Sequence, residues 1–584
     1  MKQPIQESRP SILPHETTSF STSDWRAIIV RREDGDLFVL PNVTGEQRIE
    51  GEGLVWLLPT PDSGLHSLLV RVRNGATVSV GDTGIEIGSG EHEIEEHETR
   101  PRTDVMGNAY SLSIEHGEEL EEALAAFHWD TMIPCVVERT SGVDYPDRDG
   151  FVQSSPSTER FAGTYPSCDH EFGIKGRMAF GNDLDLAVIR RMIELALRTM
   201  RENPNGTWGC PCAVQPNGDR EYYWMRGAMD GSVQAQMFRL SGNAEVQEAA
   251  WLYYAATKDR DWLARNIENL ENATTQIERF LDTDGRLDAA AFYEDAIIKD
   301  GFSAESSALT ARALGLLAEL ENTLGRTDKA AYFSELSQRI TGHLTRPFPD
   351  GLWDAKNQRF IDWIDRNGIP HDHMHLPANI LPPLLGYANQ EQKTAVETLV
   401  RAEFEAFQRF PTFVAARIAD YNDSEIGIHG PFDSCAMART WCWDAAYWHS
   451  RGESQVLLDQ LLTVARKGES EGWRMAERYG LDQAQSVAGY GSPDYYEYPC
   501  VFAWVLMHEY LGVRPALDAD LEIAPRIVGE GEVTLKAPQF AVAYRKTGNQ
   551  LTITNLAPNT RTFRVNGALE LLTLAPGETA KVKQ

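Results

Sequence analysis

The chain of 584 residues lacks long hydrophobic runs. It contains no stretch of about 18 apolar residues, so we expect no membrane-spanning helix. The first twenty residues, MKQPIQESRPSILPHETTSF, also lack an apolar core of signal-peptide length. These absences predict a cytoplasmic protein that has no membrane partner. A monomer or homodimer is expected, although the sequence gives little information on oligomeric state.

Cysteine is present without a pattern. The seven cysteines are odd in number and irregularly spaced, and Cys210 and Cys212 are too close together for a zinc ribbon. We therefore expect reduced, mostly buried thiols, no bound metal and no cofactor. No acidic run of the EF-hand type occurs, although the sequence does not settle whether a divalent ion is bound.

Basic residues are in deficit. Lys and Arg total 55 against 86 Asp and Glu, a formal net charge of −31. Binding to a phosphate backbone requires clustered Lys and Arg, so nucleic acid is excluded as a partner. A neutral or cationic substrate agrees better with this charge, although one basic pocket could still hold an acidic sugar.

The patterning of the chain changes three times. Short apolar runs alternate with turn residues over 22–115, for example WRAIIV and GLVWLL, and predict an N-terminal β-sandwich over 1–115. Residues 116–182 are predicted as a linker helix followed by an irregular loop. About a dozen segments over 183–515 repeat apolar residues at i, i+3, i+4 and i+7. Strand patterns return over 516–584 as a small C-terminal β domain.

A dozen helices suit six helical hairpins closed into an (α/α)6 toroid. A helical solenoid is the structural alternative, but no fixed repeat length is present. The predicted fold is therefore mainly α, with β domains at both ends, and the aromatic loops between hairpins place a site on one face of the toroid. Fold alone does not fix function.

Three segments combine aromatic and charged side chains, as sugar-binding sites do. The first runs from Gly206 to Asp230 and contains Tyr223, Trp224 and Arg226. Sugar rings stack on aromatic faces, and sugar hydroxyl groups take bonds from charged groups. An aromatic core plug with Arg226 in a structural ion pair explains the pattern equally well.

The second segment is FYED, which ends at Asp295, eight residues before the expected helix cap Ser303. Burial beside aromatic rings raises the pKa of a carboxyl group. A glycosidase needs such an acid, protonated near neutral pH. Glu294 is the candidate, with Tyr293 and Asp295 beside it as substrate contacts; the alternative is a solvated Glu–Asp pair in a turn.

The third segment, GWRMAERY, begins at Gly472. Its Glu477 is flanked by Arg474 and Arg478, which would keep the carboxylate ionised. An inverting glycosidase needs an ionised base to activate water. The alternative is a surface helix with Arg–Glu pairs.

In order and spacing, the three segments resemble glycoside hydrolase family 15, the glucoamylase-like enzymes of the six-hairpin glycosidase superfamily. GCPCAVQPNGDREYYWMRGAMDG occupies the place of the family's GxxxA…YxWxRD segment. FYEDAIIKDGFSAESSALTARALGLLAELENTLG follows the order of the acid loop and its helix, and MAERYG occupies the place of the base segment. The resemblance covers roughly residues 185–510.

The resemblance implies that Glu294 is the general acid and Glu477 the general base. It also assigns substrate binding to Tyr223, Trp224 and Arg226.

Two positions depart from the family pattern. Gly227 stands where the family has the Asp that grips the sugar, and Asp230 is a substitute one helical turn on. Tyr293 stands where the family has Trp. We therefore expect a subsite that accepts a sugar other than terminal α-glucose.

Further polar segments offer alternatives. His371, His373 and His375 have the spacing of a strand ligand set, but no strand is expected there, so His373 is predicted to contact substrate from a loop. Glu497 is the reserve base, although a capping role is favoured for it. Trp473 is expected to contact the sugar.

The predicted function is an inverting exo-glycosidase that acts on an α-linked oligosaccharide, with Glu294 and Glu477 about 6.5–9.5 Å apart. A polysaccharide lyase or α-L-rhamnosidase-type enzyme on the same toroid is the second hypothesis. A lyase would use His371 or His373 as base and Arg226 or Arg439 to neutralise a uronate. A non-catalytic carbohydrate-binding protein is the third.

Overall fold

The computed structural model describes most of the chain. The described residues are 11–14, 17–33, 36–41, 45–49, 51–60, 63, 65–97, 108–138, 151–154, 164–166, 169–215, 218–294, 297–427, 435–480, 492 and 494–583. No helix among them is long and apolar enough to cross a membrane. Six cysteines are free and buried, whereas Cys168 lies outside the described residues.

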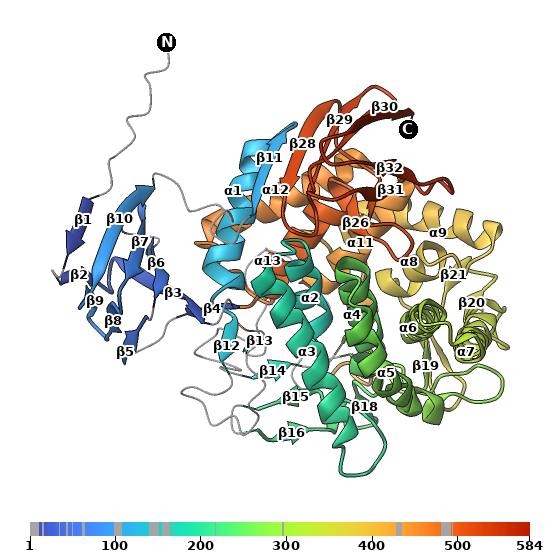
Figure 1. Ribbon diagram of the computed structural model, residues 1–584. Coiled ribbons are helices and arrows are strands. Elements are labelled where there is room, and N and C mark those ends of the chain that lie inside the picture. The colour runs from blue at the N-terminus through green and yellow to red at the C-terminus, as the bar shows by residue number, and fades with distance from the viewer. Residues whose placement is uncertain are drawn as a thin grey trace.

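Six inner helices form a closed ring (Figure 1). Each contacts the next in chain order, and the last of them, α13, contacts the first, α2. The inner helices are α2 (His170–Met178), α4 (Ser241–Thr257), α6 (Ala304–Thr323), α8 (Leu376–Leu384), α11 (Ala438–Arg451) and α13 (Glu497–Trp504). The predicted (α/α)6 toroid is confirmed.

Six outer helices pack around this ring. They are α1 (Gly117–Phe127), α3 (Asp183–Arg201), α5 (Arg260–Phe280), α7 (Thr327–Thr345), α9 (Gln390–Ala402) and α12 (Ser454–Ser470). Because an outer helix separates each inner helix from the next, all inner helices run in the same direction. Their N-terminal ends therefore meet at one end of the ring.

Burial distinguishes the two rings. The inner helices α4 and α6 are buried on almost every side, whereas the outer helix α5 buries one stripe. Polar side chains on the inner helices are thus enclosed and need partners inside the ring. Ser303 begins α6 as expected, since its hydroxyl accepts the backbone N–H of Ser306 at 3.1 Å.

The N-terminal domain consists of two antiparallel sheets. A continuous apolar run from Val55 to Leu58 is buried, and Val70 lies in the same core. The first sheet has the order β1 (Ser11–Pro14), β10 (Glu91–His97), β7 (Ser67–Arg73), β6 (Glu52–Pro59), β3 (Trp25–Glu33) and β4 (Asp36–Pro41); the second has β2 (Thr18–Ser21), β9 (Gly84–Gly88), β8 (Thr77–Val80) and β5 (Gly45–Arg48).

The C-terminal region also forms two sheets. One is β11 (Ala109–Ser113), β28 (Gly531–Lys536), β29 (Val542–Thr547), β30 (Gln550–Asn555) and β33 (Thr579–Lys583); the other is β26 (Val513–Pro515), β27 (Leu521–Ile523), β31 (Arg561–Val565) and β32 (Leu572–Leu574).

Two segments belong to a different domain from the one that was expected from the sequence. Strand β11 was expected in the N-terminal domain over 1–115 but pairs with β28 of the C-terminal sheet. Helices α1 and α2 fall within the expected linker of 116–182 but belong to the double ring. The first hairpin of the toroid therefore starts well before residue 183.

Short elements surround the N-terminal ends of the inner helices. They are η2 (His128–Met132), β12 (Val136–Glu138), β13 (Phe151–Gln153), β14 (Tyr165–Pro166), β15 (Ala213–Val214), β16 (Arg220–Glu221), β17 (Trp224–Gly227), β18 (Gln234–Met237), β19 (Phe302–Ser303), β20 (Trp353–Asp354), β21 (Arg359–Phe360), β22 (Trp363–Ile364), β23 (Pro370–His371), α10 (Phe404–Phe407), η3 (Ile418–Asp420), β24 (Ala436–Met437) and β25 (Arg478–Tyr479). By contrast, η4 (Val505–Tyr510) continues α13 at its C-terminal end. No strand was expected near His371, yet it lies in β23, paired with β22.

Candidate active site

A cavity of about 130 Å³ lies at the end of the ring where the inner helices begin. It brings together aromatic, acidic and basic side chains from segments far apart in the sequence. Its lining residues are Thr164, Asp169, Cys212, Ala213, Gln215, Glu221, Trp224, Phe238, Tyr293, Arg439, Glu477, Arg478 and Tyr495. At ~30 Å³ per water molecule, this volume holds about four waters, on the scale of one sugar ring.

Glu477 lines the cavity from the residue before β25, not from a surface helix. Its Oε1 accepts hydrogen bonds from Nη2 and Nε of Arg478 at 2.9 and 3.1 Å. Its Oε2 accepts the backbone N–H of Ser492 at 2.9 Å. The carboxylate is thus fixed in position, with its side chain 7% exposed.

Arg439 connects three inner helices at the floor of the cavity. Its guanidinium contacts Asp169 at 3.0 Å, just before α2, and donates to Glu497 at 2.8 Å in α13. It also donates to the carbonyl oxygen of Tyr293 at 3.1 Å. The Tyr495 hydroxyl donates to the other Asp169 oxygen at 2.7 Å. Arg439 is therefore occupied by partners of the protein itself.

Glu497 does not line the cavity, although it touches Arg439. Burial raises the pKa of Glu497 to about 7, against the opposing effect of the Arg439 charge. Its expected role as reserve base would require contact with a sugar, which this position beneath Arg439 does not provide.

Trp224 supplies an aromatic wall from β17. The Arg226 guanidinium lies 4.6 Å from the centre of its ring, and Phe238 packs against it at 5.3 Å. Arg226 is buried behind this wall and is not among the lining residues. The segment expected to be a loop between helices thus forms a β-hairpin of β17 and β18.

Three other predicted sugar contacts lie away from the cavity. Tyr223 is 64% exposed, and its hydroxyl accepts a hydrogen bond from Asn205. Asp230 is exposed and bonds to Ser232 within its own turn. Trp473 is buried, with its ring edge against Phe127.

Glu294, the predicted general acid, faces away from the cavity and is 1% exposed. Lys299 donates to its Oε1 at 2.7 Å, and His375 Nε2 lies 2.5 Å from the same oxygen. Burial by itself would raise the pKa of Glu294, but the charges of Lys299 and His375 hold it well below its usual range. A general acid needs the opposite environment. Asp295 lies outside the described residues.

His373, predicted to contact substrate, lies with His371 beside Glu425. Its ring stacks on Tyr421 with centroids 4.0 Å apart. Neither histidine lines the cavity.

Asp169, Glu221 and Tyr495 line the cavity although the sequence reasoning did not select them. Asp169 is followed by His170 and Glu171, and adjacent side chains rarely converge on one point. Its neighbours do diverge: Glu171 accepts the Tyr293 hydroxyl at 2.8 Å below the cavity. The signal that identifies Asp169 is its place directly before an inner helix.

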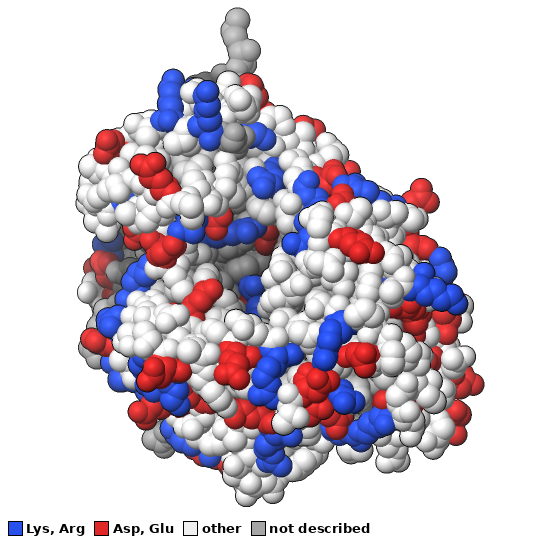
Figure 2. Space-filling model, turned by 90° about the vertical axis from the view of Figure 1, so that its right-hand side faces the viewer, with Lys and Arg blue, Asp and Glu red and all other residues white. Residues whose placement is uncertain are grey.

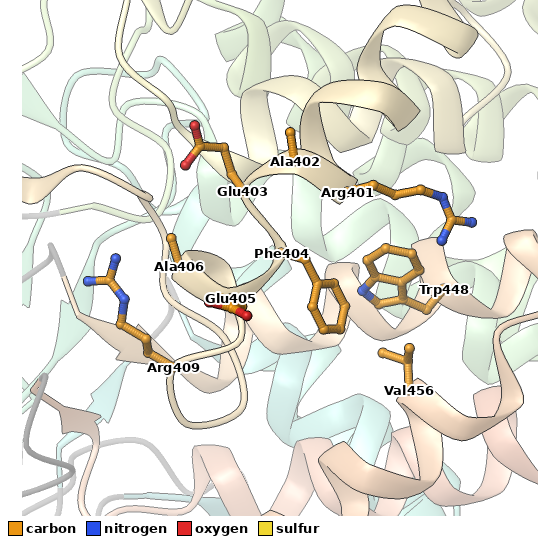
Figure 3. A pocket seen from close by; sticks show the side chains of 9 residues that line it. All are labelled: Arg401, Ala402, Glu403, Phe404, Glu405, Ala406, Arg409, Trp448 and Val456. Carbon is orange, nitrogen blue, oxygen red and sulfur yellow. The ribbon is translucent and has the colours of Figure 1, made fainter.

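A larger hollow of about 770 Å³ lies between α9, α11 and α12 (Figure 3). Arg401 covers the Trp448 ring there and pairs with Glu453 at 2.6 Å. None of the predicted site residues lines it. On the face of the molecule in Figure 2, acidic and basic side chains are interspersed.

No protein-family model matches the chain, and no curated protein does. Solved structures share its fold. A GH78 family rhamnosidase of Bacillus sp. GL1 has a TM-score of 0.53 and 13% identity, over 97% of this chain and 54% of that one. An α-L-rhamnosidase from Aspergillus terreus has a TM-score of 0.51 and 13% identity, over 99% and 63%. A sialidase has a TM-score of 0.54 and 10% identity, over 98% and 58%.

The chain thus spans less than two thirds of the length of these three structures. At such low identity the likeness shows the fold alone. The six-hairpin architecture is shared with the rhamnosidases, and membership of family 15 stays a prediction.

Proposed function

We propose that the chain is an inverting exo-glycosidase that releases one neutral sugar from the end of an α-linked oligosaccharide. The observation that carries the proposal is the cavity itself. It has room for about one sugar ring, and Glu477, Trp224 and Glu221 all line it. An aromatic face with carboxylates in one small cavity is the arrangement that glycoside hydrolysis needs.

Glu477 is the proposed general base. Its position is fixed by Arg478 and by the backbone of Ser492, so a water molecule beside it would be held in one orientation. Arg478 places a positive charge 2.9 Å from this carboxylate, and a general base takes a proton from the attacking water.

Glu221 replaces Glu294 as the proposed general acid. It lines the cavity and is exposed in the free protein. Among the described residues its carboxylate accepts one hydrogen bond, from Gln215 Nε2 at 2.5 Å, and has no ion pair. A general acid gives its proton to the glycosidic oxygen from the wall of the sugar site, and Glu221 has such a wall position. Asp169, by contrast, pairs with Arg439.

The charge balance favours a neutral sugar. Three carboxylates line the cavity, those of Asp169, Glu221 and Glu477, against two guanidiniums. Both guanidiniums already hold protein carboxylates. A uronate would add a fourth negative charge, so the lyase hypothesis has less support, and its candidate histidines lie outside the cavity. The two rhamnosidases that share the fold make a neutral deoxy sugar the first to test.

The test is a panel of α-linked gluco-, rhamno- and uronic-acid substrates, each with a good and a poor leaving group. Glu477→Gln should reduce kcat by about 10²–10⁴-fold for both leaving groups. Glu221→Gln should do so only for the poor one, because a good leaving group needs no proton. Glu391→Gln, an exposed position on α9, is the control.

Product analysis by NMR should show inversion at the anomeric carbon. Retention of configuration, or an unsaturated product that absorbs in the ultraviolet, would overturn the proposal. Tight sugar binding without bond cleavage would favour the carbohydrate-binding hypothesis instead.

A further inference from the structure

Two histidines and one glutamate converge outside the cavity. Nδ1 of His371 lies 2.5 Å from Oε1 of Glu425, and Nε2 of His373 lies 3.1 Å from the same oxygen. The three ligand atoms all lie within 4.8 Å of one another. The histidines come from β23 and the residues after it, and the glutamate from the turn before Ile426. We refer to these three residues as the His–Glu cluster.

The rings of the His–Glu cluster are held by stacking. His371 lies flat on Trp363, with centroids 4.4 Å apart and an interplanar angle of 3°. His373 stacks on Tyr421 with centroids 4.0 Å apart. Their nitrogen atoms therefore stay directed at Glu425 without help from a bound group.

Groups behind the His–Glu cluster orient it further. The second oxygen of Glu425 accepts the backbone N–H of Asn422 at 2.8 Å and its side-chain amide at 3.2 Å. Nε2 of His371, on the far side of the ring, lies 4.0 Å from an oxygen of Asp365. Metal-binding residues are oriented by outer partners of this kind.

We propose that the His–Glu cluster binds one divalent transition-metal ion, of which Zn²⁺ is the best match. Two imidazoles and one carboxylate are a known zinc ligand set, whereas Ca²⁺ and Mg²⁺ prefer oxygen ligands. With metal–ligand bonds of about 2.0–2.1 Å, ligand atoms in a tetrahedral site lie about 3.3 Å apart. The His373–Glu425 pair already has nearly this spacing, and the His371–Glu425 pair must widen by less than about 1 Å.

A second group of potential ligands, Glu294, Glu305 and His375, gives a useful contrast. The Lys299 ammonium lies within it, 2.7 Å from Glu294 and 3.4 Å from His375 Nε2. The protein thus supplies its own cation at that position. In the His–Glu cluster, no Lys or Arg contact with Glu425 occurs among the described residues.

The ion would brace the wall of the cavity. The backbone N–H of Ile298 donates to the Glu425 carbonyl at 2.7 Å, and that of Met229 to the Ile426 carbonyl at 2.8 Å. Met229 lies two residues after the end of the hairpin strand β17, which carries Trp224. The metal site does not depend on the proposed glycosidase activity, because its occupancy is measured directly.

The experiment uses the full chain, freed of any affinity tag and of metal, and titrated with Zn²⁺ and Co²⁺. Calorimetry should show about one strong site per chain, and bound Co²⁺ should give visible absorption bands. His373→Gln and His371→Gln should each weaken binding by at least about 100-fold.

His66→Gln is the matched control, because His66 also contacts one glutamate, Glu96, at 3.2 Å on the surface. Glu425→Gln removes the carboxylate ligand but keeps the size of the side chain. Circular dichroism establishes that each variant is folded. Absence of a strong site in the wild type, or equal affinity in the wild type and both histidine variants, would overturn the proposal.

Discussion

Glu294→Gln separates a catalytic acid from a member of a buried ion pair. The substitution keeps the size of the side chain but removes the charge opposite Lys299. Removing one partner of a buried pair costs about 3–5 kcal/mol. Lys299 keeps Asp362 at 2.9 Å, so its charge stays partly compensated. We therefore expect Glu294→Gln to lower the free energy of unfolding by about 3 kcal/mol, the lower end of that range.

Lys299→Met should cost more, because Glu294 and Asp362 then lose the cation that they share. Because two buried carboxylates then lack that cation, we expect the free energy of unfolding to fall by about 5 kcal/mol, the upper end of the range. Both substitutions remove the same interaction. The double variant should therefore lose less than the sum of the two single losses, with a coupling of up to about 3 kcal/mol.

The assay is urea unfolding followed by the fluorescence of the 14 tryptophans, together with kcat on the best substrate of the panel. We expect Glu294→Gln to lower the free energy of unfolding while kcat of the folded protein falls less than about tenfold. A catalytic acid would behave in the opposite way, with kcat lower by about 10²–10⁴-fold and little change in stability. That result would refute the reassignment.

Three further predictions concern the cavity wall, a buried acid and the closure of the ring. Trp224→Ala should raise KM about tenfold with little change in kcat, because the ring provides binding surface rather than chemistry; a large fall in kcat alone would contradict this. Burial raises the pKa of Asp444 to about 6, so between pH 4 and 6 the folded state holds more protons than the unfolded state and loses stability as pH rises. The wild-type unfolding free energy should fall by about 2 kcal/mol relative to Asp444→Asn over this window, and parallel pH curves for the two proteins would refute the raised pKa. A methyl group at Gly176 would lie 2.4 Å from Cys500 Cα, where α2 meets α13, whereas Gly342 in α7 has open space. Thermal unfolding should show Gly176→Ala destabilised by about 1–3 kcal/mol and Gly342→Ala unchanged or stabilised; equal effects would contradict the close packing.

Much of the architecture was predictable because its signals are local. WRAIIV and GLVWLL became β3 and β6, which pair along their length. The outer helices show the expected amphipathic stripe, and Ser303 caps α6. Each of these features depends on side chains a few residues apart, which is the distance over which periodicity and capping act.

The first hairpin of the ring escaped prediction because its inner helix looks unlike a helix. The α2 sequence HEFGIKGRM contains two glycines and three charged residues among nine. Gly176 lies against Cys500 of α13, so the glycine permits the close approach that closes the ring. Lys175 and Glu171 form a buried ion pair inside the ring. Tertiary packing here outweighs intrinsic helix propensity.

The position of Glu294 outside the cavity has a different physical cause. Tyr293 and Glu294 are adjacent, yet Tyr293 lines the cavity while Glu294 faces Lys299. The segment is irregular, with bends at Phe292 and Tyr293, so successive side chains point in different directions. The FYED motif therefore locates the segment correctly but leaves undecided which of its residues meets the substrate. The position of Lys299, five residues later, is fixed only by the folded ring.

The ring explains why the cavity residues are scattered along the chain. Each inner helix begins at the same end of the ring, so the residues at or just before the helix starts lie close together there. Asp169 precedes α2, Arg439 lies at the start of α11, and Tyr495 precedes α13. The residues before α8 also lie at this end of the ring, but they have other partners. His371 contacts Glu425, and His375 contacts Glu294. Helix starts, more than motifs, are therefore where chemistry should be sought in a toroid of this kind.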